Sequence, residues 1–345
     1  MTRRIGLSRK VAESKRRGTN SKALGGAAAR ALIRGEIAWR GRIVGESTES
    51  GTKEIRISAV GMSDMGRVRK NNEDNLVICD LTSGDIRVSP PLKNDPVGKH
   101  GTLLMVADGM GGEAAGEVAS QIAVTTVTKR LYDNLQSSGN VKESNFVLLL
   151  REAIEYANQV IYQKAQAGSA HKGMGTTTTA VAIFGPYLFV AQVGDSRAYL
   201  VRNSNVVQLT RDQTFLNYLE DIGAEMPADP EKDSRKSILT QAVGSSENVD
   251  VKVTYTKVRV GDRLLLCSDG LYNMVPREDL AKIAITEEPL AGKCKALIAR
   301  ANEGGGTDNI TVIMAELSGP GLPPADAAAG IEFKEYREED FKSRP

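Results

Sequence analysis

Short apolar runs separated by polar turns fill the chain from residue 55 to residue 317 and predict many β-strands. Runs of β-branched or leucine-rich residues bounded by Gly, Asp or Ser are typical of strands. They occur at 55–60, 75–80, 102–108, 176–185, 187–194, 197–203, 206–210, 249–258, 262–268 and 309–317. The stretch 81–100, which contains SPPLKNDPVGKH, is expected to be a long loop between two strands.

Longer segments carry apolar residues at helical spacing. In 143–167, apolar residues recur at spacings of three and four, which favours one buried helix face: Phe146, Leu150, Ile154, Ala157 and Ile161. The segment 113–136 shows the same pattern, and a further helical stretch is expected over 277–302. Runs of strands broken by helix pairs predict an α+β domain with antiparallel sheets rather than a parallel βαβ winding.

The two ends of the chain differ in composition from the middle. Residues 1–50 hold 12 Lys and Arg against 4 Glu without a sustained apolar period, so we expect a flexible basic arm over 1–54. A solvated arm is favoured over a nucleic-acid or anionic-surface contact, because Trp39 is its only aromatic residue. Gly and Pro residues after Ser318 predict a linker and charged tail over 318–345, which leaves 55–317 as the folded domain.

Composition excludes several classes of protein and site. The 345-residue chain is 41% hydrophobic, enough for a core, yet its longest apolar runs are far shorter than the roughly 20 residues of a transmembrane helix. No secretory signal is visible at the charged start. Three cysteines without CxxC spacing argue against disulfides and a thiolate zinc site, and they predict a cytoplasmic protein. With only two histidines, His100 and His171, an imidazole zinc site cannot form.

Carboxylates recur where predicted strands meet turns. A single aspartate of this kind would be interpreted as a turn residue that accepts a hydrogen bond from its own backbone. Here the pattern repeats at five places in a chain poor in histidine, so it predicts a clustered site for hard cations such as Mg²⁺ or Mn²⁺. The acidic residues are Glu73, Asp74, Asp108, Asp195, Asp269 and Asp308.

Eight motifs in order carry a resemblance to a known family. They are RKNNED, VADGMGG, MGTTTTA, VGDSRAY, LTRDQT, LTQAVG, CSDGL and GTDNIT. Over residues 57–317 the chain resembles the metal-dependent serine/threonine protein phosphatases of the protein phosphatase 2C type, in their bacterial form. The resemblance implies a sandwich of two antiparallel sheets flanked by helix pairs. It also implies hydrolysis of phosphoserine and phosphothreonine in phosphorylated proteins, the products of a serine/threonine kinase, without a small-molecule cofactor.

The resemblance further implies two Mn²⁺ or Mg²⁺ ions, with a third in bacterial members. Asp108 would bridge the first two ions, and the Gly109 carbonyl, Asp269 and Asp308 would complete their protein ligands. Asp195 would share the third ion with Asp269. Glu73 and Asp74 would hold metal-bound waters.

The remaining implied roles concern the substrate. Arg69 would bind the phosphate, although an ordinary surface or ion-paired arginine is the alternative reading. Met110 stands where many eukaryotic members have histidine, so the general acid stays unassigned. Residues 213–237 correspond to the family's flap beside the active site. A catalytically weak scaffold protein is the competing hypothesis, which the presence of Asp108, Asp269 and Asp308 disfavours.

Overall fold

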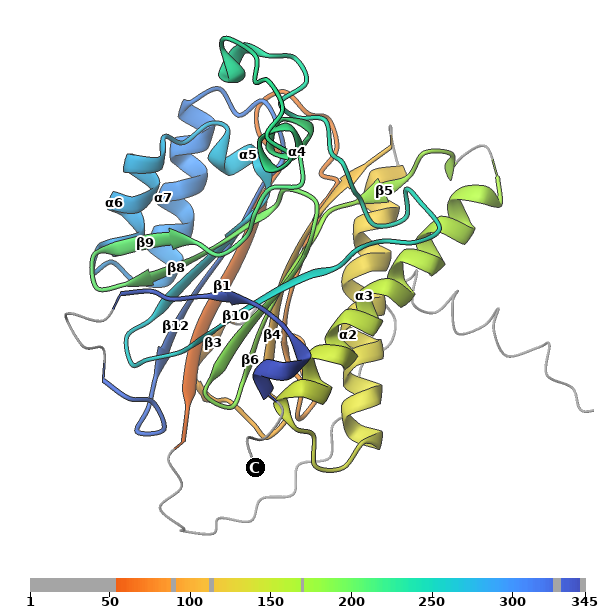
Figure 1. Ribbon diagram of the computed structural model, residues 1–345. Helices are drawn as coiled ribbons and strands as arrows, with labels where there is room; N and C mark the ends of the chain where they lie inside the picture. The colour runs from red at the N-terminus through yellow and green to blue at the C-terminus, as the bar shows by residue number, and fades with distance from the viewer. Residues whose placement is uncertain (1–53, 88–90, 112–114, 169–170, 325–329, 342–345) are drawn as a thin grey trace, which may run out of the picture. The chain divides into compact units, whose positions relative to one another are not determined.

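Two antiparallel β-sheets packed face to face form the centre of the fold (Figure 1). The computed structural model describes residues 54–87, 91–111, 115–168, 171–324 and 330–341. The first sheet has the strand order β3-β1-β12-β11-β8-β9. Its strands are β1 (Arg56–Asp64), β3 (Leu92–Pro96), β8 (Arg197–Arg202), β9 (Asn205–Gln208), β11 (Arg263–Cys267) and β12 (Ile310–Ser318).

The second sheet has the strand order β13-β10-β7-β6-β4-β2, and the short β5 pairs with the end of β4. Its strands are β2 (Asp74–Asp80), β4 (Thr102–Met110), β5 (Gly175–Thr176), β6 (Thr178–Phe184), β7 (Tyr187–Val193), β10 (Lys252–Lys257) and β13 (Lys334–Glu335). Strand β4 is buried on both faces: Leu104 and Val106 belong to the core between the sheets, while Leu103 and Met105 belong to the core under the helices. Burial on both faces explains why such strands appear as continuous apolar runs in the sequence.

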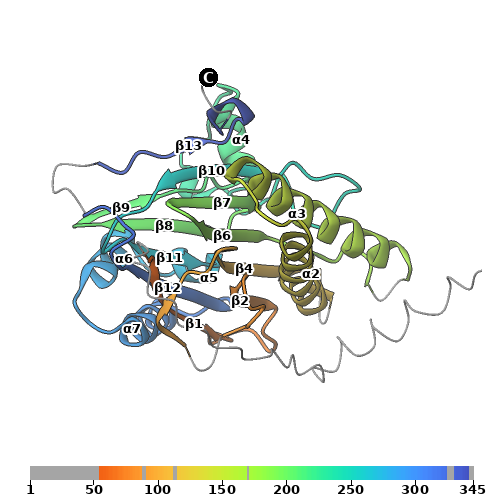
Figure 2. The same ribbon diagram turned by 90° about the horizontal axis from the view of Figure 1, so that it is seen from below.

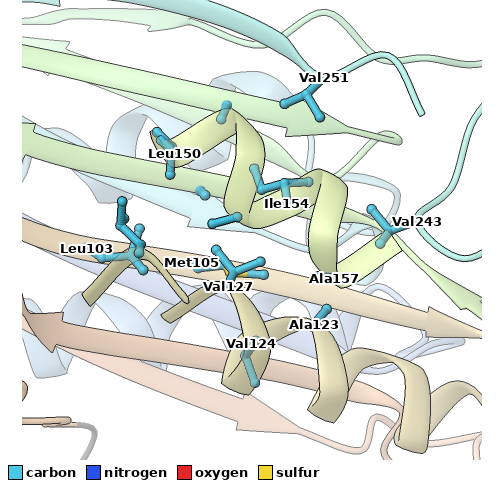
Figure 3. Packing of buried hydrophobic residues seen from close by; sticks show 14 of the residues in the cluster. Leu103, Met105, Ala123, Val124, Val127, Leu150, Ile154, Ala157, Val243 and Val251 are labelled. Atoms are coloured by element: carbon cyan, nitrogen blue, oxygen red, sulfur yellow. The ribbon is translucent and has the colours of Figure 1, made fainter. Parts of the chain in front are cut away.

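Helices cover the outer face of each sheet (Figure 2). α2 (Ala115–Ser137) and α3 (Glu143–Gln166) pack on the second sheet, and Figure 3 shows their side chains, among them Val127 and Ile154, in one cluster with Leu103 and Met105. α5 (Asp269–Tyr272), α6 (Arg277–Ile285) and α7 (Leu290–Glu303) pack on the first sheet. The predicted α+β sandwich of antiparallel sheets flanked by helix pairs is confirmed.

The flap region contains the only other helices before the tail within the described residues, α4 (Phe215–Asp221) and the 3₁₀ turn η2 (Pro230–Lys232). None of the helices in the described part of the chain combines the length and apolarity needed to cross a membrane. The expected basic arm, apart from residue 54, lies outside the described residues.

Two expectations about secondary structure are wrong. The stretch 277–302 is two helices, α6 and α7, because Pro289 lacks an N–H and precedes the first turn of α7. The stretch 81–100 is not all loop, since it contains β3, which pairs with β1 at the edge of the first sheet. Its sequence, LKNDP, has little apolar alternation because an edge strand needs to bury few side chains.

The expected domain boundary at Ser318 differs from the structure, because residues 330–341 belong to the folded domain. β13 pairs antiparallel with β10, with Tyr255 opposite Lys334. The 3₁₀ turn η3 (Glu338–Phe341) then places the Phe341 ring 4.9 Å from the Tyr255 ring and 5.1 Å from the Tyr187 ring. The aromatic residues of this charged segment pack it onto the folded domain. The charged residues around them made the segment appear to be a solvent-exposed tail in the sequence.

We expect Phe341→Ala to lower the free energy of unfolding by about 2 kcal/mol, because the half-buried ring leaves an aromatic cluster. Urea unfolding would measure the loss. Phe333→Ala is the matched control, since Phe333 is 39% exposed and should cost little. Equal unfolding midpoints for the two variants would contradict an anchored tail.

Candidate metal centre

A cavity of about 760 Å³ opens where several strand ends of both sheets meet. Strand ends far apart in sequence meet here because alternate strands of an antiparallel sheet end at the same edge. All but one of the site residues expected from the sequence line this cavity: Arg69, Glu73, Asp108, Gly109, Asp195, Asp269 and Asp308. The exception, Asp74, is 6% exposed and does not line the cavity.

Asp108 is held on β4 between two neighbouring segments. It lies directly opposite Asp74 in the β2–β4 register, so the two carboxylates come from facing positions. The Thr177 hydroxyl accepts a hydrogen bond from the Asp108 N–H at 3.0 Å, and the Thr177 N–H donates to the Asp108 carbonyl at 2.8 Å. The next residue must be glycine, since a Cβ on Gly109 would lie 2.2 Å from the Gly116 carbonyl oxygen.

Asp74 and Asp269 are linked through the residue that precedes Asp269. The Ser268 hydroxyl donates to Asp74 Oδ2 at 2.7 Å, which joins β2 to the end of β11. Asp269 begins the short helix α5, and its Oδ2 accepts from the Asn273 side chain at 3.1 Å. Its other oxygen, Oδ1, is buried and has no hydrogen-bond partner.

Asp195 has its own supporting network in the turn between β7 and β8. The Tyr272 hydroxyl of α5 donates to Asp195 Oδ2 at 3.1 Å. The Arg197 guanidinium lies 3.5 Å from the centre of the Tyr272 ring and is paired with Asp212 at 2.6 Å. Burial and then the nearby Asp195 raise the pKa of Tyr272 far above its usual range, so this hydroxyl is a donor.

Arg69 and Asp308 form an ion pair at the mouth of the cavity. The Arg69 Nη2 to Asp308 Oδ2 distance is 2.6 Å, and the two side chains are 50% and 32% exposed. An ion pair this exposed contributes roughly 0–1 kcal/mol. It can therefore open at little cost when either partner meets a stronger ligand.

The profile of the family described as Protein phosphatase 2C matches residues 96–301. The chain belongs to the protein phosphatase 2C family. It is 34% identical to the serine/threonine phosphatase stp of Listeria welshimeri over 254 residues, which is 74% of this chain and 93% of that protein.

Solved structures of phosphatase 2C proteins agree with the fold. The serine/threonine phosphatase PstP/Ppp of Mycobacterium tuberculosis has a TM-score of 0.62 and 34% identity, covering 76% of this chain and 99% of its own. The catalytic domain of the serine/threonine protein phosphatase PstP in complex with two manganese ions has a TM-score of 0.61 and 32% identity, covering 76% of this chain and 99% of that one.

Burial, with a further contribution from neighbouring carboxylates, disfavours the ionised forms of the acidic side chains in this phosphatase 2C member. Burial, followed by the charge of Asp74 and then that of Asp269, raises the pKa of Asp108 well above its usual range. Burial raises the pKa of Asp74 and of Asp269 to about 6, and Asp308 adds to both shifts. Burial and then Asp269 raise the pKa of Asp195 to about 7. A positively charged partner would relieve this repulsion.

The donor set fits hard cations that keep part of their water. Within the described segments, no three His, Cys, Asp or Glu side chains lie close enough together to hold one ion by themselves. Each ion would therefore take one or two carboxylates and complete its coordination with water, as Mg²⁺ commonly does in proteins. The buried Oδ1 of Asp269, which has no hydrogen-bond partner, is available as an oxygen ligand.

Sequence reasoning missed several residues that position the site. Asn309 is 4% exposed; its Oδ1 accepts from the Glu73 N–H at 2.8 Å and its Nδ2 donates to the Asn71 carbonyl at 2.9 Å. Ser268 and Thr177 hold Asp74 and Asp108, as described above. Asn309 and Ser268 stand next to acidic residues in the motifs GTDNIT and CSDGL, and this was the available signal for them. Thr177 stands in MGTTTTA, which contains no acidic residue, so the sequence offered no such signal for it.

Proposed function

We propose that this chain hydrolyses phosphoserine and phosphothreonine residues of proteins at a centre of two Mn²⁺ or Mg²⁺ ions. The observation that carries the proposal is the group of acidic side chains around one cavity, with Arg69 at its mouth. The relatives named as serine/threonine phosphatases, and the two manganese ions of one of them, support it. These relatives also argue against a role as a scaffold protein without catalytic activity.

The proposed metal ligands come from three strand ends. Asp108, the Gly109 carbonyl, Asp269 and Asp308 would hold the two ions, which supply an activated water for in-line attack on phosphorus. Asp74 and Glu73 would orient metal-bound waters. Ser268 keeps the Asp74 carboxylate oriented through its 2.7 Å hydrogen bond.

Arg69 would bind the substrate phosphate after leaving Asp308. Its planar guanidinium matches two phosphate oxygens, and a phosphate dianion is a stronger partner than an exposed carboxylate. The same exchange frees Asp308 for metal. Movement of the half-exposed Arg69 side chain would thus free the Asp308 carboxylate for metal and the Arg69 guanidinium for the phosphate.

A third, weaker ion is proposed at Asp195 with Asp269. We expect Asp195→Ala to keep the two tighter ions and to slow phosphopeptide hydrolysis by about tenfold or more, since the loss of a metal-supporting group typically costs 10–100-fold. Metal analysis of the purified variant beside its kinetics would check this. Loss of all bound metal would make Asp195 a ligand of the main centre, and unchanged turnover would remove it from the mechanism.

The source of the substrates, the cellular location and the role of the basic arm are also proposals. The substrates would be proteins phosphorylated by a serine/threonine kinase, because a phosphatase of this class reverses that modification. We propose a cytoplasmic location, since Cys79, Cys267 and Cys294 are all buried and unpaired, as expected in a reducing compartment. For the basic arm we propose a solvated segment.

A phosphothreonine peptide assay with and without added Mn²⁺ tests the proposed function. We expect release of phosphate only with the metal. Binding of the phosphopeptide without turnover in saturating Mn²⁺ would favour the scaffold hypothesis instead. Equal turnover in excess chelator would overturn the metal mechanism.

A further inference from the structure

Exposed apolar side chains gather around the catalytic cavity. The described residues hold twelve exposed large apolar side chains, and seven of them lie in the loop 65–71, at the end of β4, or on and next to the flap. Three line the cavity itself, and we call these the apolar rim: Val68, Met110 and Ile238, which are 64%, 38% and 52% exposed. A soluble surface normally scatters such residues singly, so a group around one cavity suggests a binding role.

The loop that carries Val68 is fixed in place. The Asn309 side chain donates to the carbonyls of Met65 at 3.0 Å and Asn71 at 2.9 Å, which ties both ends of the loop to the start of β12. Val68 therefore remains exposed in a well-anchored loop, directly beside Arg69 in the sequence.

The other two rim residues are anchored as well. Met110 is the last residue of β4 and pairs with Gly175 of β5. The Ile238 carbonyl accepts from the Phe215 N–H at 2.8 Å, and its own N–H donates to the Arg235 carbonyl at 3.0 Å. Three apolar side chains from three separate segments thus line the same cavity as Arg69, each on anchored backbone.

We propose that the apolar rim binds bulky apolar side chains that flank the phosphorylated residue of a protein substrate. This inference rests on the proposed function and deepens it. Because Arg69, Val68 and Ile238 line the same cavity, substrate residues next to a phosphate bound at Arg69 would reach Val68 and Ile238. Burying a valine or isoleucine side chain contributes roughly 1.5–3 kcal/mol when complete, so partial burial at the rim is enough for a clear preference.

The charges near the flap give no strong preference of their own. Residues 213–237 contain six acidic and three basic residues, but Arg211 pairs with Glu220 and Asp221, Lys232 with Asp229, and Arg235 with Asp233. The basic Arg69 and Lys70 line the cavity beside Val68, so the feature of the rim that selects among substrates is its apolar surface. Apolar neighbours of the phosphorylated residue gain contact with it. The preferred substrate class is therefore phosphothreonine or phosphoserine flanked by Leu, Ile, Val or Met.

Two phosphothreonine peptides of equal length and charge test the proposal, one with leucine and one with serine on both sides of the phosphothreonine. With the full chain in Mn²⁺, we expect kcat/KM to be about tenfold higher for the leucine peptide, a size typical of small apolar contacts. p-Nitrophenyl phosphate, which has no flanking residues, is the third substrate.

Variants assign the preference to the rim. We expect Val68→Ser and Ile238→Ser each to lower the leucine-to-serine ratio about threefold, because each removes part of the apolar contact. The ratio is insensitive to any general change in activity or in the amount of folded enzyme. Ile222→Ser is the matched control: Ile222 is 57% exposed on the flap but does not line the cavity, so the ratio should stay at the wild-type value.

The outcomes separate the two proposals. If the wild type fails to hydrolyse even p-nitrophenyl phosphate in Mn²⁺, the proposed function itself is wrong. If it hydrolyses this compound but the peptide ratio is near one or inverted, the apolar rim is overturned. A tenfold ratio that survives in both rim variants would likewise overturn the assignment to Val68 and Ile238.

Discussion

Asp108→Asn is expected to reduce phosphopeptide hydrolysis by about a thousandfold or more. The substitution removes the charge of a residue that we propose would hold the ions, and metal catalysis contributes several kcal/mol, of which each 1.36 kcal/mol is a factor of ten. The shape of the side chain is kept, and the hydrogen bonds that fix this residue use its backbone N–H and carbonyl with Thr177. The loss should therefore come from chemistry and not from misfolding.

The stability of the same variant provides a second measurement. In chelator, Asp108→Asn should melt at a higher temperature than the wild type, because it removes one buried charge from a group of like charges. Adding Mn²⁺ should then stabilise the variant less than the wild type. Asp133→Asn on the surface of α2, whose side chain is 49% exposed, is the control that should change neither quantity. Turnover at the wild-type rate in Asp108→Asn would contradict the proposed metal centre.

Removing the metal should stop turnover and reverse the pH dependence of stability. Asp74 and Asp269 have pKa values of about 6 and Asp195 of about 7, all above the value of about 4 in an unfolded chain. Between pH 4 and 7 the folded state without metal therefore binds more protons than the unfolded state. Its free energy of unfolding falls as the pH rises through this window.

Thermal melts in chelator at several pH values would measure this effect. We expect the melting temperature to fall by several degrees between pH 5 and pH 7.5, since one unit of pKa corresponds to about 1.4 kcal/mol and 1 kcal/mol shifts it by roughly 2–4 °C. With Mn²⁺ the trend should be lost or inverted, because deprotonated carboxylates bind metal more tightly. A melting temperature in chelator that is constant across this range would mean that burial and neighbouring charges do not raise the pKa values of these carboxylates.

The order of elements was largely predictable because strands and helices are local. The apolar runs gave ten strands, and the spacing of residues such as Leu150 and Ile154 identified α3. The failures came where the local signal is weak. β3 is an edge strand with little alternation of apolar and polar residues. The break between α6 and α7 depends on Pro289 alone, within a stretch whose other residues have a helical pattern.

The sequence by itself determined the family, the acidic residues and their positions at strand ends, because these depend on residue types in a fixed order. The tertiary structure alone decided which of them meet. Asp74 accepts a hydrogen bond from Ser268, which lies 194 residues further along the chain. Arg69 forms an ion pair with Asp308, and the Phe341 ring packs against the Tyr255 ring. Such partners follow from strand register and side-chain packing, which bring distant segments together. Local patterns carry no record of them, because the residue pattern of one segment does not specify which distant segment it will contact.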